Sequence, residues 1–222
     1  MKYFTTDFTA FFKDLAANNH RDWFTANKAR YEASVKKPFE VFVTDLITAL
    51  AKKDKSLKVK PGDCIFRINR DIRFSKDKTP YKLNASAAIS AGGRKDMESP
   101  GIYVELGPEK MALAGGIYMP SKTSLENIRK AMARQPETFV KLLKAPAFKK
   151  NWGDLQGDRN KIIPPALRPV AEKCPYIYNK QFYFWTELSP SLITKPDLIE
   201  RIVAYYTAGK DVSDFLGKAM KR

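Results

Sequence analysis

The chain has 222 residues, of which 44% are apolar and 12% aromatic, so it can bury a substantial core and is not expected to be disordered. Its 40 Lys and Arg residues outnumber 24 Asp and Glu residues, and the formal net charge of +16 favours nucleic acid, nucleotides or another polyanion as a partner. No apolar run is long enough to cross a bilayer, and no signal-peptide pattern opens the chain. We therefore expect a cytoplasmic protein without a membrane partner.

Cysteine and histidine are scarce. Cys64 and Cys174 lie far apart in the sequence, and His20 is the single histidine. These residues are too few and too scattered for a disulfide framework or a zinc site. We expect two free thiols, no bound metal and no cofactor.

Helical spacing of apolar residues marks the first quarter of the chain. It predicts helices over residues 7–15 and 21–36, with Thr6 or Asp7 as the first N-cap, and a third helix that restarts at Pro38. After the turn signal Pro61-Gly62-Asp63, the period changes to alternation. The alternating segments predict strands near residues 64–74, 83–90, 101–106 and 111–117.

Helical spacing returns after the fourth predicted strand. Thr123 and Glu126 have the spacing of a capping box, and helices are expected up to Arg134, from Pro136, and from Pro196 onward, with a further strand over 177–188. Short connections favour antiparallel neighbours, and no repeat or long linker divides the chain. The sequence predicts an α+β fold, a central and mostly antiparallel sheet flanked by N-terminal and C-terminal helices, in a single domain over 1–222.

The most unusual segment runs from residue 66 to residue 82. Residues 52–82 contain eleven Lys or Arg and four Asp, a net charge of +7, so the positive charge is clustered. If residues 66–74 form a regular strand, Arg70 lies on the apolar face. It would then form an internal ion pair, with Asp71 or Glu105, or stand at the floor of a pocket.

The other basic side chains of this segment suit an anion such as phosphate or carboxylate. They are Arg67, Arg73, Lys76, Lys78 and Lys82. The alternative is that Asp71 and Asp77 neutralise part of the set and that solvent surrounds the rest. If the protein is an enzyme, one of these two carboxylates is the general base and Tyr81 orients the substrate, although no motif names a reaction.

A second candidate element is the Gly115-Gly116 pair, which precedes a helix whose free N–H groups could bind an anion. The alternative is an ordinary strand exit with an ordinary cap, since no nucleotide-binding glycine motif is present. Arg129 lies one turn after Leu125 in this helix. It would either face the cavity that holds the anion or lie on the surface.

Aromatic residues gather between Tyr176 and Trp185. Alternation puts Phe182 and Phe184 on one strand face and Tyr183 and Trp185 on the other. Core packing is the favoured interpretation, and at most one face could stack on bases.

The segment FRINRDIRFSKDKTPYK resembles the signature stretch of a bacterial and fungal family known as domain of unknown function 2461. Three further stretches are similar to the same family: the opening from Phe11 to Lys28, the run Gly115 to Pro120, and the helix at Ile128 to Ala131. The resemblance covers nearly the whole chain. It implies one domain and a bacterial-type cytoplasmic protein, and it supplies no reaction, cofactor or catalytic residue.

Three functions remain open from the sequence. The first is a pocket for a phosphate-bearing or other anionic small molecule, built on residues 66–82. The second is a nucleic-acid-binding protein without sequence preference, and the third is an interaction module for an acidic protein. We expect at least two of Arg67, Arg70 and Arg73 to approach one common anion or carboxylate.

Overall fold

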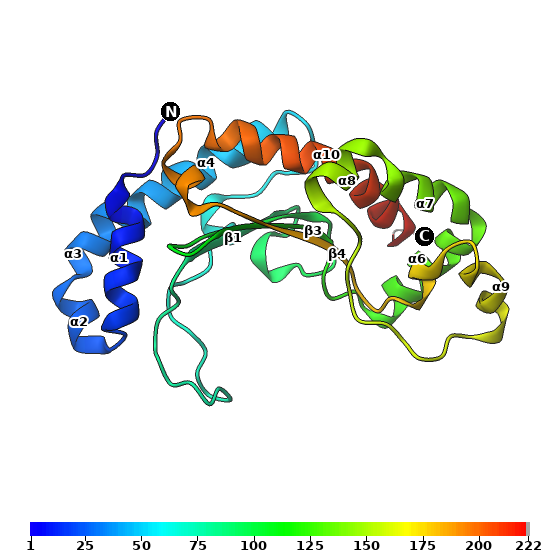
Figure 1. Ribbon diagram of the computed structural model, residues 1–222, viewed down its shortest axis with the longest axis horizontal. Coiled ribbons are helices and arrows are strands. Elements are labelled where there is room, and N and C mark those ends of the chain that lie inside the picture. Colours follow the sequence, from blue (N-terminus) through cyan, green and yellow to red (C-terminus); the bar gives the residue numbers. More distant parts are fainter. Residues whose placement is uncertain (221–222) are drawn as a thin grey trace.

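The computed structural model describes residues 1–220, and it is an arch built on one four-stranded sheet (Figure 1). The strands are β1 (Ala85–Ser90), β2 (Gly101–Leu106), β3 (Met111–Ile117) and β4 (Phe182–Leu188). They pair in the order β1-β2-β3-β4, and each neighbouring pair is antiparallel. The predicted α+β class and antiparallel sheet are therefore confirmed.

The N-terminal helices begin at one end of the arch and continue onto the sheet. They are α1 (Thr6–Ala17), α2 (Arg21–Ala26), α3 (Lys28–Tyr31), a π-helical turn at Glu32–Lys36, α4 (Lys37–Ala51) and the short α5 (Pro61–Cys64). The expected helix over 21–36 is thus divided into shorter pieces. Pro38 causes no break, because it lies in the first turn of α4, where its missing N–H has no helical partner to lose.

The other end of the arch follows the third strand. It contains α6 (Lys122–Arg134), α7 (Pro136–Lys144), α8 (Pro146–Trp152), a 3₁₀ turn at Pro165–Leu167 and α9 (Arg168–Ala171). A 3₁₀ turn at Pro175–Tyr178 takes the place of the first residues of the strand expected over 177–188, and another covers Pro190–Thr194. The chain then enters α10 (Leu198–Met220), the helix expected from Pro196 onward.

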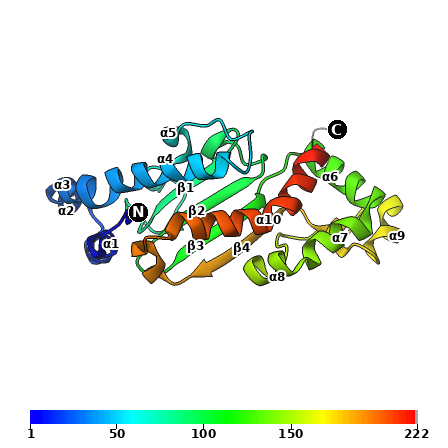
Figure 2. The same ribbon diagram turned by 90° about the horizontal axis from the view of Figure 1, so that it is seen from above.

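Helices α4 and α10 cover one face of the sheet (Figure 2). The side chains of Ile102, Val104 and Leu106 point to this face and are almost fully buried, as strand alternation requires. From the helices, Phe42 and Ile202 are completely buried in the same core. Each such side chain contributes about 1.5–3 kcal/mol through burial, so this layer holds the arch together.

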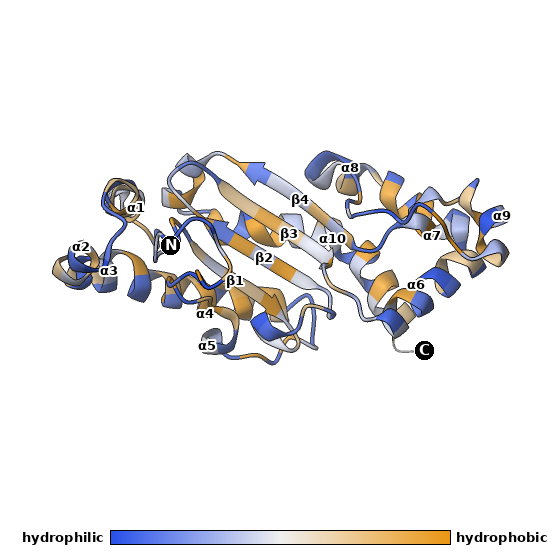
Figure 3. Cartoon of the chain, turned by 90° about the horizontal axis from the view of Figure 1, so that it is seen from below, coloured by the Kyte–Doolittle hydropathy of each residue, from blue (hydrophilic) through white to orange (hydrophobic). Residues whose placement is uncertain are grey.

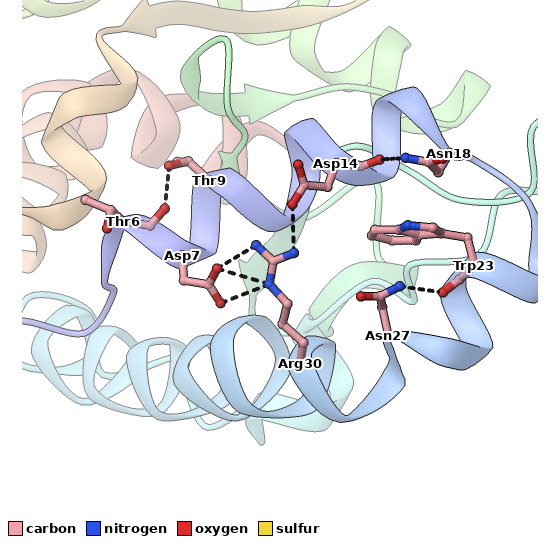
Figure 4. A network of polar contacts seen from close by, with 8 residues as sticks. All are labelled: Thr6, Asp7, Thr9, Asp14, Asn18, Trp23, Asn27 and Arg30. Atoms are coloured by element: carbon pink, nitrogen blue, oxygen red, sulfur yellow. Dashed lines mark hydrogen bonds and ion pairs between the residues drawn. The ribbon is translucent and has the colours of Figure 1, made fainter.

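An ion-pair network joins the first helix to the third (Figure 4). The guanidinium of Arg30 donates to Asp7 Oδ1 at 2.6 Å and to Asp14 Oδ2 at 2.7 Å, so one side chain of α3 contacts both ends of α1. The N-cap of α1 is Thr5, whose hydroxyl accepts from the Asp7 N–H at 3.3 Å, one residue before the expected position.

The expected strand over 64–74 is absent from the structure. After α5, the chain makes single bridges, Ile65 with Ala87 and Asn69 with Tyr81, and then projects from the sheet as a long extended loop, drawn in teal in Figure 1. We call residues 66–82 the basic arm. Its apolar residues alternate as those of a strand do, but over most of its length no other segment of the described chain pairs with it as a neighbouring strand.

Candidate pocket on the open face of the sheet

Within residues 1–220, no α-helix covers the face of the sheet opposite α4 and α10 (Figure 3). Strand pairing places Tyr103 beside Ala88 on one side and Ala114 on the other, and Ala114 beside Trp185. The next row toward the strand ends consists of Ser90, Gly101, Gly116 and Tyr183. Small side chains therefore alternate with large rings on this face, which leaves space above the small ones.

This space is a pocket of about 610 Å³, within the usual size range of small-molecule sites. Its walls come from all four strands, the start of the basic arm, and the loop between β1 and β2. The aromatic rings in the wall are those of Phe66, Tyr103, Tyr118, Tyr183 and Trp185. Its polar side chains are those of Ser90, Asp96, Ser99 and Gln156.

The rings of the pocket are arranged in ordered pairs. Tyr103 and Trp185 lie 6.1 Å apart between centroids with planes at 25°, and Phe66 meets Tyr103 edge-on at 6.1 Å. Tyr118 meets Tyr183 edge-on at 5.5 Å. Rings set in fixed positions over small residues can receive a flat ligand without first rearranging.

Two lysines lie beside the rings of this face. Lys82 Nζ is 5.0 Å from the centroid of Phe66, and Lys110 Nζ is 5.6 Å from the centroid of Trp185. Lys110 also pairs with Glu187, so its charge is compensated. Burial lowers the pKa of Lys82, and repulsion from Arg67 lowers it further, while Glu105 partly opposes this.

Glu105 itself accepts a hydrogen bond from the Tyr103 hydroxyl at 2.8 Å. Burial is the main cause that raises the pKa of Tyr103 above its usual value, so this phenol stays protonated and acts as a donor. Lys82 thus lies near both the positive charge of Arg67 and a carboxylate that is already bonded to a tyrosine.

Two arginines of the basic arm form ion pairs with different carboxylates. Arg70 binds Asp77 and Thr79, while Arg73 binds Asp71 with Nε–Oδ1 at 3.0 Å and Nη2–Oδ2 at 2.7 Å. Arg70 and Arg73 thus bind different carboxylates, while the charge of Arg67 also lowers the pKa of Asp71, the carboxyl that Arg73 binds. A bound anion shared by two of the arginines stays a prediction. Arg70 and Arg73 each lie two to nine residues from their own partners along the extended loop, because the arm does not form the regular strand that would align them.

Arg70 also differs from its expected place on a buried face. Its side chain is 27% exposed, and its partner is neither Asp71 nor Glu105 but Asp77, from the returning half of the arm. The pKa of Asp77 falls to about 2, first because the Thr79 N–H donates to it and then because Arg70 does. The pKa of Asp71 also falls to about 2, mainly through the side chain of Arg73. Both carboxylates are ionised and paired at neutral pH.

The remaining residues of the arm have separate surroundings. Arg67 and Lys76 are exposed, and Lys78 Nζ donates to the carbonyl of Ile72 at 2.9 Å. Tyr81 is buried and stacks on Phe24 at 4.1 Å. Tyr81 therefore holds the base of the arm in the protein.

At the start of the helix after Gly115-Gly116, a carboxylate of the protein itself accepts the hydrogen bonds. Helix α6 is capped by Ser121 instead of the expected capping box of Thr123 and Glu126. Ser121 Oγ donates to Glu98 Oε2 at 3.0 Å, and Ser124 Oγ donates to the same oxygen at 2.5 Å. The chain's own carboxylate thus takes the position expected for a ligand.

The two glycines serve the sheet and the pocket. Gly116 has φ +86° and a Cβ there would lie 2.3 Å from the carbonyl oxygen of Phe182, so only glycine fits. At Gly115, a Cβ would lie 2.3 Å from the ring of Phe184, which packs on the helix-covered face. Their backbones line the pocket.

Arg129 is buried, with 8% exposure, and does not enter the pocket. Its Nε donates to the carbonyl of Ile177 at 3.0 Å and its Nη2 to the carbonyl of Asn179 at 3.1 Å. It therefore joins α6 to the segment before β4, and neither the expected cavity position nor the surface position is correct.

Both cysteines are buried free thiols, as expected, and burial raises the pKa of Cys64 to about 11. Among residues 1–220, no three His, Cys, Asp or Glu side chains gather as a metal site would require. No helix in the same range combines the length and the apolar character needed to cross a bilayer.

Residues 7–215 match the model of a family described as a conserved hypothetical protein, DUF2461. The chain belongs to this family. Every residue of the DUF2461 pocket and the whole basic arm lie inside the matched span. No curated protein and no solved structure matches the chain significantly. The description of the DUF2461 family names no activity.

Most of the residues that line the pocket were not predicted from the sequence. The alternation of Tyr183 and Trp185 against Phe182 and Phe184 is confirmed, but only the phenylalanines are fully in the core. The available signal was the series of Ala, Gly and Ser at the open-face positions of β1, β2 and β3, since strand positions packed against helices carry larger apolar residues.

Proposed function

We propose that this protein binds a small molecule that carries a planar ring and an anionic group, in the pocket on the open face of the sheet. The observation that carries the proposal is the pocket itself, with ordered aromatic rings around a floor of Ala, Gly and Ser. A flat ring laid over Ala114 would contact Tyr103 and Trp185 at once. Such contacts are the usual source of affinity for ring systems.

The anionic group follows from the cations beside Phe66. Lys82 is half-buried, and the repulsion between Lys82 and Arg67 is relieved when an anion binds between them. Phosphate fits this requirement, because a guanidinium and an ammonium both donate to its oxygens. A nucleotide is the simplest molecule with both a ring and a phosphate.

The test is a titration with the four common ribonucleoside monophosphates, with the matching nucleosides, and with inorganic phosphate alone. Trp185 lies in the pocket wall, so we expect binding to change tryptophan fluorescence and to raise the thermal unfolding midpoint. Lys82→Met is expected to weaken nucleotide binding by about tenfold, in line with the loss of one charge-assisted hydrogen bond, and to leave nucleoside binding unchanged.

Ala114→Leu places a larger side chain on the pocket floor and is expected to abolish binding. Ala91→Leu is the matched control, because Ala91 is exposed and outside the pocket. If none of the probes binds, or if Ala114→Leu binds them as the parent does, the proposal is wrong.

A further inference from the structure

The tip of the basic arm carries an aromatic ring that the fold does not use. Phe74 is 95% exposed, the most exposed large apolar side chain among residues 1–220. The arm projects from the sheet into solvent, on the side away from α4 and α10 (Figure 1). A single exposed apolar side chain needs no partner to explain it, so a binding role for Phe74 depends on what surrounds this ring.

The surroundings of this ring are charged. The guanidinium of Arg73 lies 5.8 Å from its centroid, and Lys76 and Lys78 follow within four residues. The whole arm has six Lys or Arg against two Asp, a net charge of +4. Both Asp residues are held by arginines of the arm, so the lysines at the tip form no ion pair within the described chain.

The arm has a fixed base. The Arg70 N–H donates to the carbonyl of Pro80 at 2.8 Å, and the Lys82 N–H donates to the carbonyl of Ile68 at 2.8 Å. Asn19 exchanges two hydrogen bonds with the backbone of Tyr81, at 3.0 and 3.1 Å. A partner that binds the tip therefore meets a loop whose base is already ordered, which reduces the entropy lost on binding.

We propose that the basic arm binds single-stranded nucleic acid, with the ring of Phe74 stacked on an unpaired base and with Arg73, Lys76 and Lys78 on the neighbouring phosphates. An aromatic ring among cations is the combination that single-strand-binding surfaces use. A protein partner or a lipid surface would be met by several apolar side chains together. Here Ile72 is the single other apolar residue between Arg70 and Lys78, and the overall net charge of +16 favours a polyanion. This site is separate from the pocket, so either proposal stands without the other.

The experiment is fluorescence anisotropy with a labelled oligothymidylate of about 16 nucleotides, the upper range of known site sizes, titrated at several salt concentrations. We expect Phe74→Ala to weaken binding by about tenfold or more, the usual loss for one stacked base, and Phe74→Trp to restore it. Each phosphate contact contributes about −0.7 to the slope of log affinity against log salt for a single strand. The double variant Lys76→Ala/Lys78→Ala should therefore make the slope shallower by about 1.4.

The matched control is Lys52→Ala/Lys53→Ala, which removes the same charge from two exposed lysines at the end of α4. It should leave affinity and slope unchanged, and all variants should keep the parent's thermal unfolding midpoint. The proposal is overturned if the oligonucleotide does not bind, if Phe74→Ala binds like the parent, or if the two double variants lose affinity equally. Binding to phosphatidylserine vesicles that depends on Phe74, without binding to the oligonucleotide, would overturn it in favour of a membrane surface.

Discussion

At the scale of single residues, Arg129 shows how a charged group is kept inside this protein. Burial lowers the pKa of its guanidinium, and two main-chain carbonyls, of Ile177 and Asn179, accept its hydrogen bonds. These carbonyls belong to the turn that leads into β4. The guanidinium thus donates the hydrogen bonds that water would give to these two carbonyls if the turn did not lie against α6.

Replacing this residue should therefore reduce stability strongly. Arg129→Met removes two charge-assisted hydrogen bonds and leaves two carbonyls without a donor, so we expect the free energy of unfolding to fall by about 2–4 kcal/mol. Lys130→Met, at the exposed neighbouring position, should change it by no more than about 0.5 kcal/mol. Urea unfolding curves measure both values, and equal midpoints would contradict the structural role given to Arg129.

At the scale of elements, the contact between α1 and α3 depends on ionised carboxylates. Arg30 lowers the pKa of Asp7, chiefly through its side-chain hydrogen bonds, with a further contribution from Ser34. Because the pKa is lower in the folded state than in the unfolded one, the stabilisation is complete above the unfolded value of about 3.9 and is lost as the pH falls through the folded value.

The variant Asp7→Asn tests the direction of this pH dependence. The two side chains are 31% and 40% exposed, so solvent screens the pair, and at pH 7 we expect a loss of at most about 1 kcal/mol. The difference in unfolding free energy between parent and variant should shrink progressively as the pH falls below about 4. Urea titrations at several pH values measure it, and a difference that grows toward acid would show that the pair has the opposite effect.

At the scale of the whole molecule, α10 is the element that spans the arch. It packs on α4 and β3 at the sheet, and on α6, α7 and α8 at the other end (Figure 2). Ile202, near its start, and Leu216, near its end, are both fully buried. An element shared by both ends couples their unfolding, so we expect the chain to unfold as a single domain.

The variant Phe139→Leu tests this coupling. Phe139 is fully buried in α7, far from α1 in the arch, and its shortening should cost about 1–2 kcal/mol. In native-state hydrogen exchange, the most protected amides of α1 should lose the same free energy as those of α7. A loss confined to α6, α7 and α8 would show that the two ends of the arch unfold separately.

The sequence predicted the class of most elements correctly, and it failed where the partner of a segment decides the structure. Residues 66–74 have the alternation of a strand, and the segment 101–106 has it too. β2 pairs on both sides, whereas the segment from Ile65 through the arm makes only single bridges, at Ile65 and Asn69. The expected burial of Arg70 failed with that strand, because it depended on the register of the strand.

By itself, the sequence determined the helices α1, α4, α6, α7 and α10, the strands β1, β2 and β3, the two faces of β4 and the excess of positive charge, because periodicity and composition are local properties. The tertiary structure alone decided which face of the sheet the helices cover, and therefore that Tyr103, Tyr183 and Trp185 line a pocket while Phe184 enters the core. It also decided that Glu98 takes the start of α6 and that Phe74 stays in solvent. The physical reason is that alternation defines two faces of a strand without distinguishing them, and only the packing of distant segments buries one and leaves the other open.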